Sequence, residues 1–145
     1  AHPEVDYFFR ICGDSPYYDG ELLQNAVRKI EDNDLDILTS MSNKGYPMGC
    51  NVELLKKSMF LQNYSNFEIE SHFEHVTGYF YENINSFKFE EINCGIDNYN
   101  YSDYKFSVDT KDDLELAKLM LFEMKYEPWN YSFNQKIEIQ KKIKN

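Results

Sequence analysis

The sequence contains little arginine and no long apolar run. Only two of its 15 cationic residues are arginines, against 25 acidic residues, and the formal net charge is −10 at pH 7. A surface this acidic repels duplex phosphates, which disfavours general nucleic-acid binding. It suits a protein that binds phosphates through a metal ion. The apolar stretches are only a few residues long, so we expect no segment to cross a membrane.

Cysteine is also scarce, and its spacing excludes a disulfide scaffold. Cys12, Cys50 and Cys94 are odd in number, far apart and without a CxxC pair, so we interpret them as small hydrophobic residues in a reducing compartment. No leader with a cleavage site precedes the first strand pattern, which makes the cytoplasm the expected location. The chain of 145 residues corresponds to one domain. The motifs GxGxxG, GxxxxGK[ST], HExxH and GxSxG do not occur.

The first forty residues predict a strand, a helix and a second strand. Residues 5–12 are rich in β-branched and aromatic side chains, typical of a strand that is buried on both faces. Apolar residues have helical spacing over 21–30, and residues 36–39 form a short strand pattern. A right-handed crossover would make the two strands a parallel pair. The fold class is therefore α/β, with a mainly parallel sheet.

The rest of the chain continues this alternation. The spacing of Ile69, Phe73, Val76 and Phe80 predicts one helix over 68–83, and Thr110 with Asp113 resembles a capping box. We expect the lysines of the terminal helix to be a solvated face. The remaining predicted elements are a loop over 43–49, a strand over 51–55, a helix over 56–63, strands over 87–92 and 104–108 around a polar loop over 93–102, a helix after Thr110 that ends before Pro128, and a helix over 132–144.

Two aspartates stand where predicted strands end. Asp14 and Asp109 each follow a strand and precede a turn into a helix. Ligands of open α/β sheets collect beyond the carboxyl ends of the strands, so these carboxylates can converge on one crevice. Two carboxylates that leave positions for water and phosphate are a usual way to hold Mg²⁺. The alternative is that each aspartate merely caps a turn.

A second metal hypothesis concerns histidine. His72 and His75 have i, i+3 spacing, and Glu68 precedes His72 by one helical turn, which could form half of a zinc site. No third histidine or cysteine lies nearby in the sequence. The favoured interpretation is that one histidine donates a hydrogen bond into the crevice and the other is solvated.

Four segments together resemble one family. They are Phe9-Arg-Ile-Cys-Gly-Asp-Ser-Pro16, Tyr46-Pro-Met-Gly-Cys-Asn-Val-Glu53, Glu74-His-Val-Thr-Gly-Tyr-Phe-Tyr-Glu-Asn83 and Phe106-Ser-Val-Asp-Thr-Lys-Asp-Asp113. They resemble the spore-coat-polysaccharide type of cytidylyltransferase, which is related to the synthetases of CMP-activated 3-deoxy-manno-octulosonate and sialic acids. The resemblance covers residues 5 to about 124.

The resemblance implies a three-layer, Rossmann-like nucleotide-diphospho-sugar transferase fold and a nucleotidyl transfer. A sugar hydroxyl would attack the α-phosphate of CTP, giving a CMP-sugar for surface polysaccharide and pyrophosphate. Asp14 and Asp109 match the positions that hold Mg²⁺ in the related synthetases. Arg10, Asn51, Glu53 and His75 would bind substrate. The segment around Tyr46 lies where related enzymes build a dimer contact, which implies a homodimer.

The chain departs from the family pattern in three ways. Asn51 stands where the family usually has Asp, and Gly20 replaces the usual Pro after Asp19. The family's N-terminal part, with its triphosphate-binding and base-reading loop, has no counterpart. We therefore expect residues 1–127 to be the C-terminal portion of a cytidylyltransferase domain, followed by a terminal helix over 128–145. We also expect these residues alone not to turn over CTP.

Two other functions remain open from the sequence. A metal-dependent glycosyltransferase of related fold would need an Asp-x-Asp motif, and the one occurrence is Asp34-Leu35-Asp36, at a helix-to-strand junction. A non-catalytic remnant of the fold, acting as an interaction module, is the other alternative.

Overall fold

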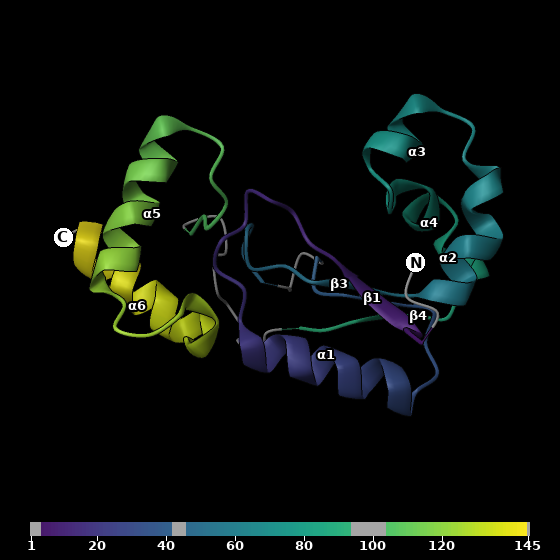
Figure 1. Cartoon of the computed structure of the whole chain (residues 1–145), viewed down its shortest axis with the longest axis horizontal. Coiled ribbons are helices and arrows are strands. Elements are labelled where there is room, and N and C mark those ends of the chain that lie inside the picture. Colours follow the sequence, from purple (N-terminus) through teal and green to yellow (C-terminus); the bar gives the residue numbers. More distant parts are fainter. Residues whose placement is uncertain (1–3, 42–45, 94–103, 145) are drawn as a thin grey trace.

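The computed structural model describes residues 4–41, 46–93 and 104–144 (Figure 1). Four strands and six α-helices form its framework. The strands are β1 (Tyr7–Arg10), β2 (Ile37–Thr39), β3 (Glu53–Lys56) and β4 (Phe89–Glu91). The helices are α1 (Gly20–Asp32), α2 (Lys57–Asn63), α3 (Glu70–Glu74), α4 (Gly78–Glu82), α5 (Lys111–Glu123) and α6 (Phe133–Lys144).

The sheet is mixed, which confirms an α/β fold but corrects the prediction of a mainly parallel sheet. The strand order is β1-β3-β2-β4. β3 is antiparallel to both β1 and β2, and only the pair of β2 and β4 is parallel. β1 and β2 run in the same direction, but β3 lies between them. A strand–helix–strand pattern in the sequence fixes relative direction, but not which later strand inserts between the two.

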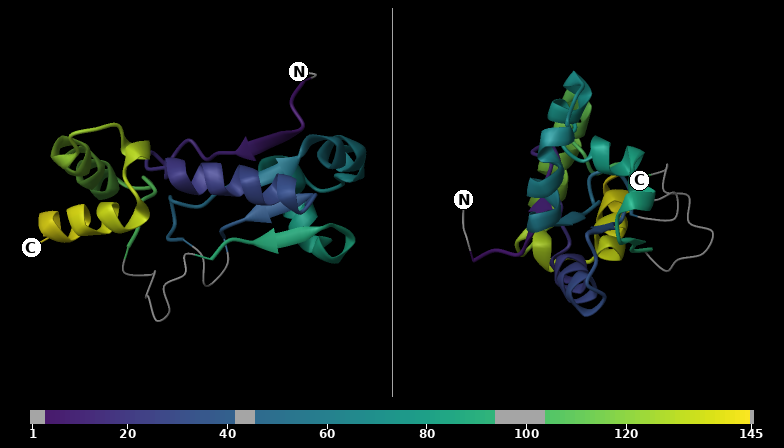
Figure 2. Two further views of the ribbon diagram at one scale, coloured as in Figure 1. Left: turned by 90° about the horizontal axis from the view of Figure 1, so that it is seen from below. Right: turned by 90° about the vertical axis from the view of Figure 1, so that its right-hand side faces the viewer.

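The sheet is the middle of three layers (Figure 2). Successive strand residues point to opposite faces, so neighbouring leucines enter different cores. Leu38 and Leu54 pack on α1, which buries Ala26 and Ile30 against them. The other face meets α2 and α4 through a second set of apolar residues: Ile37, Leu55, Met59, Phe67 and Phe80.

A third core joins α5 and α6 beside one end of the sheet. Tyr17, Phe106, Met120 and Ile137 are all buried there. Lys136 of α6 is also buried and donates from Nζ to the carbonyl of Tyr18 at 3.0 Å, so the predicted solvated lysine face is wrong at this position. Burial lowers the pKa of its ammonium group. The sequence pattern does not distinguish a buried lysine from a solvated one at the start of a helix.

The predicted helix over 68–83 is two short helices instead. α3 ends at Glu74 and α4 begins at Gly78, with β-branched Val76 and Thr77 between them. Phe80 is buried, but Ile69 and Phe73 are about half exposed, at 50% and 51%. The apolar spacing therefore does not form one stripe. β-branched side chains lose rotamer freedom in a helix, which favours the break at this point.

The predicted strand over 104–108 joins no sheet, and its chain bends at Ser107. Its alternate residues bond to two loops: the Phe106 N–H donates to the Met48 carbonyl, and the Val108 N–H donates to the Asp14 carbonyl, each at 2.8 Å. The alternation in the sequence is real, but loops satisfy the backbone in place of a strand. The predicted capping box at Thr110 and Asp113 is confirmed.

Cys50 is buried, as expected of a small hydrophobic residue, whereas Cys12 is only half-buried. Cys94 and most of the predicted polar loop over 93–102 lie outside the described residues. Among the helices of the described ranges, each is too short or too polar to cross a bilayer.

Candidate functional site

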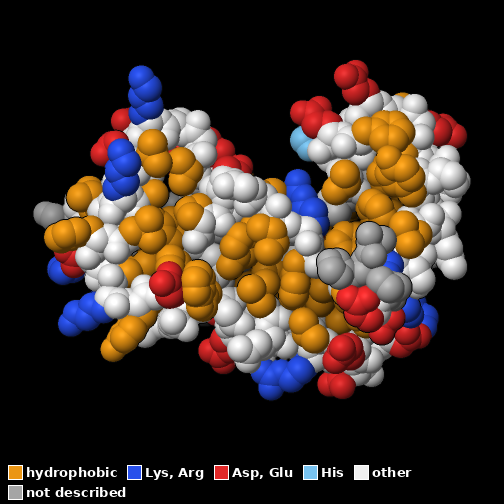
Figure 3. All heavy atoms as spheres, in the orientation of Figure 1, with side chains coloured by type: hydrophobic (Ala, Val, Ile, Leu, Met, Phe, Trp, Pro, Cys, Tyr) orange, Lys and Arg blue, Asp and Glu red, His pale blue; other side chains and the backbone are white. Residues whose placement is uncertain are grey.

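A cavity of about 130 Å³ opens where β1 and β2 end. Figure 3 shows the surface hollowed between the lobe of α5 and α6 and the lobe of α3 and α4. Five of the six residues that the sequence predicts as site residues line the cavity, and His75 does not. The lining residues are Arg10, Cys12, Asp14, Ser15, Tyr18, Met41, Met48, Gly49, Asn51, Glu53, Ser107 and Asp109.

Arg10, Glu53 and Thr39 form one row across the sheet. Arg10 pairs with Glu53 across β1 and β3, and Glu53 pairs with Thr39 across β3 and β2. Directly opposed residues project on the same face, here the face that α4 covers. Arg10 Nη1 donates to Glu53 Oε2 at 2.9 Å, and the Glu53 side chain is only 3% exposed. Burial lowers and the Glu53 carboxylate raises the pKa of Arg10, with a net rise.

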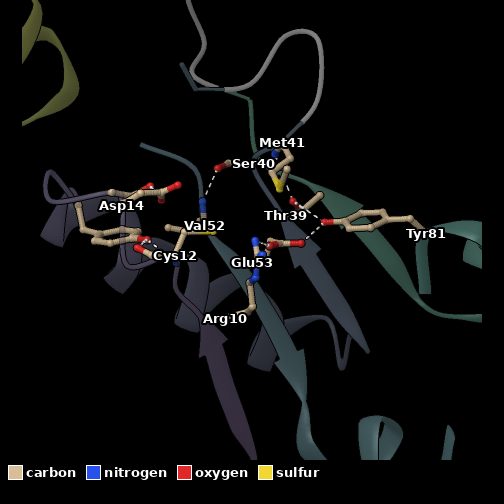
Figure 4. Close-up of polar contacts among 11 residues, drawn as sticks. Arg10, Cys12, Asp14, Thr39, Ser40, Met41, Val52, Glu53 and Tyr81 are labelled. Carbon is tan, nitrogen blue, oxygen red and sulfur yellow. Dashed lines mark hydrogen bonds and ion pairs between the residues drawn. The ribbon is translucent and has the colours of Figure 1, made fainter. Parts of the chain in front are cut away.

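Tyr81 of α4 completes this row from above the sheet (Figure 4). Its hydroxyl donates to Glu53 Oε1 at 2.8 Å and contacts Thr39 Oγ1 at 3.0 Å. Burial, and then the neighbouring Glu53 charge, raise the pKa of the phenol. Glu53 therefore has a partner on each carboxylate oxygen. The sequence analysis missed Tyr81, because only the break between α3 and α4 brings it over the sheet.

The segment after β1 places Asp14. The Tyr18 hydroxyl accepts a hydrogen bond from the Cys12 N–H at 3.1 Å and lies 3.3 Å from the Cys12 carbonyl, which fixes the path of the turn. The Asp14 side chain is exposed and accepts from Ser15 Oγ at 3.0 Å. In Figure 4 Asp14 and Cys12 lie on the opposite side of the view from Tyr81.

The segment before α5 brings Asp109 to the same cavity. The bond from the Val108 N–H to the Asp14 carbonyl joins the two aspartate-bearing segments. Asp109 Oδ2 accepts from Ser107 Oγ at 2.9 Å and pairs with Lys105 Nζ at 2.7 Å. Lys105, and then Ser107, hold the pKa of the Asp109 carboxyl below its ordinary value.

Gly49 allows this close approach. Its φ is +87°, and a Cβ atom there would lie 2.2 Å from the main chain of Phe106 and Ser107. Only glycine combines this backbone conformation with so close a contact. The turn of Gly49 and the segment that carries Asp109 therefore pack main chain against main chain.

Asn51 is the one polar side chain of the cavity with an unused buried atom among the described residues. Its Oδ1 is buried and accepts no hydrogen bond. A buried acceptor without a partner costs about 1–3 kcal/mol, so a water molecule or a ligand is expected to donate to this atom. Asn51 Oδ1 can therefore accept a hydrogen bond from a molecule in the cavity.

The donor set fits a hard divalent cation. Asp14 and Asp109 supply exposed carboxylate oxygens to one cavity, and Mg²⁺ is usually held by one or two carboxylates plus water and substrate phosphate. Within the described ranges no three His, Cys, Asp or Glu side chains cluster as a fuller metal site would require.

The histidines of the sequence hypothesis lie elsewhere. His72 is buried: its Nδ1 accepts from the Glu68 N–H at 3.4 Å, and its Nε2 lies 3.0 Å from Glu82 Oε2. Both ring nitrogens therefore have partners within the chain, which weighs against the zinc hypothesis. His75 is exposed where α3 ends, outside the cavity. Its substrate-binding role stays a prediction.

The Asp-x-Asp sequence of the glycosyltransferase alternative does not reach the cavity. Asp34 pairs with Lys56 and Lys88, each at 2.6 Å, and Asp36 accepts from the Lys88 N–H at 3.0 Å. These contacts lie at the turn before β2, whereas the cavity lies after its end. The two aspartates have structural partners there.

The fold is similar to that of a solved structure. No family model matches the sequence, and no curated protein matches it. The chain is similar to the structure of a cytidylyltransferase from Leptospira borgpetersenii serovar Hardjo-bovis (strain JB197), with a TM-score of 0.84 and 25% sequence identity. The match covers 97% of this chain and 58% of that one. The chain has a cytidylyltransferase fold.

The cytidylyltransferase fold supports the family that the four sequence segments resemble, at the level of the transferase and not of its sugar. This chain spans 58% of the length of the cytidylyltransferase it matches. The cavity residues from three of the segments, at Arg10 and Asp14, Asn51 and Glu53, and Asp109, meet in the structure. Tyr18 lines the same cavity without a signal in the sequence.

Proposed function

We propose that this protein is a sugar cytidylyltransferase that makes a CMP-sugar for surface polysaccharide. The observation that carries the proposal is the cavity itself, in which three separate segments of a cytidylyltransferase fold bring five predicted site residues together. The oxygen of a sugar hydroxyl attacks the α-phosphorus of CTP and forms a new P–O bond. The bond to the β-phosphate bridging oxygen breaks, pyrophosphate leaves with the electron pair, and the hydroxyl proton passes to water.

Asp14 and Asp109 would hold Mg²⁺, which when bound orients the triphosphate and neutralises its charge. Other residues of the chain shape the cavity and contact the sugar. Arg10 and Glu53 form a rigid part of the cavity wall, since both carboxylate oxygens of Glu53 have partners, Oε2 in Arg10 and Oε1 in Tyr81. Asn51 offers an acceptor to the sugar.

The cavity is smaller than the roughly 300–1,000 Å³ of pockets that enclose drug-sized ligands. At about 130 Å³ it suits a single sugar-sized group and not a whole nucleotide. We therefore assign it to the sugar. Dimerisation through the segment around Tyr46, and a cytoplasmic location, stay predictions.

The test measures pyrophosphate release by the protein as the cell makes it, with each of the four nucleoside triphosphates, Mg²⁺ and a panel of sugars. We expect release with CTP. Asp14→Asn and Asp109→Asn should each lower kcat/KM by about 100-fold or more. Asp112→Asn is the matched control, because Asp112 is exposed in the first turn of α5 and does not line the cavity.

A second measurement tests the metal site apart from turnover. Mn²⁺ added to the isotopically labelled chain should broaden the amide signals of the segments around Asp14 and Asp109 first. The effect should disappear in Asp14→Asn and persist in Asp112→Asn. Uniform broadening over the acidic surface would contradict the shared site.

A further inference from the structure

Two completely buried polar residues of α6 contact the segments that carry the candidate metal ligands. Lys136 and Gln140 are spaced i, i+4, so they share one face of the helix. Neither is among the described residues that line the cavity. Lysine and glutamine are rarely buried without a partner, because a desolvated donor without an acceptor is unfavourable. Each of these side chains donates to a main-chain carbonyl outside the helix.

Lys136 holds the segment that carries Asp14. Its Nζ donates to the Tyr18 carbonyl at 3.0 Å, and a hydrogen bond from an ammonium group is stronger than one between neutral groups. The side chain of Tyr18 turns back to the end of β1, where its hydroxyl accepts from the Cys12 N–H at 3.1 Å. Asp14 follows Cys12 by two residues. Its main chain is therefore linked to α6 through Tyr18.

Gln140, one turn further along α6, holds the segment that carries Asp109. Its Nε2 donates to the Lys105 carbonyl at 3.0 Å. The ammonium group of Lys105 in turn pairs with Asp109 Oδ2 at 2.7 Å. The side-chain oxygen of Gln140 accepts from Lys144 Nζ at 3.2 Å, so both ends of the Gln140 amide have partners and its orientation is fixed.

The two sets of contacts meet where the Val108 N–H donates to the Asp14 carbonyl. With α6 they close a ring of contacts, which runs from the helix through both aspartate-bearing segments and back to the helix. A closed ring leaves little freedom to the separation of Asp14 and Asp109. The two carboxylates are exposed and cannot fix that separation by themselves. Mg²⁺ requires near-ideal ligand geometry, so support behind its ligands matters.

We propose that Lys136 and Gln140 are positioning residues. Through them α6 clamps the two aspartate-bearing segments at the separation that a divalent cation requires. The cation belongs to the proposed function, on which this part of the inference rests. The clamp itself consists of contacts within the chain and is measured without metal.

Hydrogen exchange of the Val108 amide, in the metal-free full-length protein, tests the clamp. Lys136→Met and Gln140→Met keep side chains of similar length and remove the donors. We expect each variant to accelerate exchange at Val108 by about 5- to 10-fold relative to the amides of β3, the usual effect of losing one net hydrogen bond. Lys136→Gln keeps a donor of shorter reach and replaces Lys136→Met if that variant does not fold.

Ile137→Ala is the matched control for exchange. Ile137 is buried beside these residues on α6 and packs in the same core, but its side chain has no donor. The substitution should destabilise the fold and accelerate exchange at Val108 and in β3 by the same factor. If Val108 exchange follows that of β3 in the clamp variants as well, Lys136 and Gln140 only stabilise the fold and the clamp is refuted.

A titration with Mn²⁺ tests the consequence for the metal. Binding is read from the broadening of amide signals in the segments around Asp14 and Asp109. Lys136→Met and Gln140→Met should each weaken Mn²⁺ binding by about 10-fold, as changes behind metal ligands commonly do. Ile137→Ala should leave the affinity of the folded protein unchanged. Unchanged affinity in both clamp variants would refute the positioning role, even if exchange at Val108 is faster.

The two measurements separate this inference from the proposed function. If the natural protein binds no Mn²⁺ at the cavity, the metal site of the proposed function is refuted, and exchange at Val108 still decides whether α6 clamps the segments. If Mn²⁺ binds with the expected differences but CTP gives no pyrophosphate with any sugar, the transferase is refuted and the clamp stands.

Discussion

The main-chain N–H of Val108 donates a 2.8 Å hydrogen bond to the carbonyl of Asp14. This bond joins the loop after β1 to the segment before α5 and sets both candidate metal ligands, Asp14 and Asp109, at one cavity. The cavity therefore depends on main-chain packing as much as on its own side chains.

Gly49→Ala should destabilise the fold at the main-chain contact that underlies the cavity. The substitution places a Cβ atom 2.2 Å from the main chain at Phe106 and Ser107, on a backbone with φ of +87°. We expect a loss of about 3 kcal/mol or more in the free energy of unfolding, from backbone strain and overpacking together. Urea denaturation measures it. Gly13→Ala is the control, because no atom lies within 4 Å of its added Cβ, and an equal loss in both variants would contradict the close-packing argument.

Arg10→Met should be strongly destabilising. It leaves the Glu53 carboxylate, 3% exposed, without its cation. Removing one partner of a buried ion pair costs about 3–5 kcal/mol. The double variant Arg10→Met/Glu53→Gln should recover most of that loss, because no buried charge remains. Arg28→Met, at the other arginine, should stay within about 0.5 kcal/mol because Arg28 is exposed. Thermal unfolding of the natural protein and the three variants measures these differences in stability.

The N-cap of α1 should matter more than that of α5. Asp19 accepts from the N–H groups of Glu21 and Leu22 and also from that of Phe133, where α6 begins. Asp19→Ala removes all three acceptor contacts and should cost about 2–4 kcal/mol. Thr110→Ala removes the cap of α5 and should cost about 1 kcal/mol. Amide exchange should also accelerate in α6 in the first variant only; unchanged exchange there would show that Asp19 does not hold α6.

The ion pairs of Asp34 should make the free energy of unfolding depend on pH in the acidic range. The ammonium groups of Lys56 and Lys88 lower the pKa of its carboxyl from 3.8 to about 2. A carboxyl whose folded pKa is lowered stabilises the fold above its unfolded pKa, and that contribution is lost as pH falls from about 4 toward 2. Asp34→Asn should therefore lose less stability between pH 5 and about 2.5 than the natural protein does. The double variant Lys56→Met/Lys88→Met should behave in the same way, and an unchanged slope in either would refute the assignment.

The sequence alone predicted many of the local elements and five of the twelve residues that line the cavity. Helix α1 follows from its apolar spacing, and the cap of α5 follows from Thr110 and Asp113, because both depend on neighbours within a few residues. The strand order of the sheet could not be predicted from the sequence, since the insertion of β3 between β1 and β2 depends on contacts between residues far apart in the chain. The break that places Tyr81 over Glu53 was missed for a related reason, because the apolar spacing over 68–83 fits one helix as well as two.

Only the tertiary structure decided which charges are paired and which atoms are left without partners. Lys136 and Glu53 are buried ions with partners from distant segments, and Asn51 Oδ1 is a buried acceptor with none among the described residues. Residue type fixes what a side chain can donate or accept, but solvent exclusion and the approach of remote segments fix whether it does so. That is why five residues of the cavity could be named from the sequence, whereas their partners could be found only from the fold.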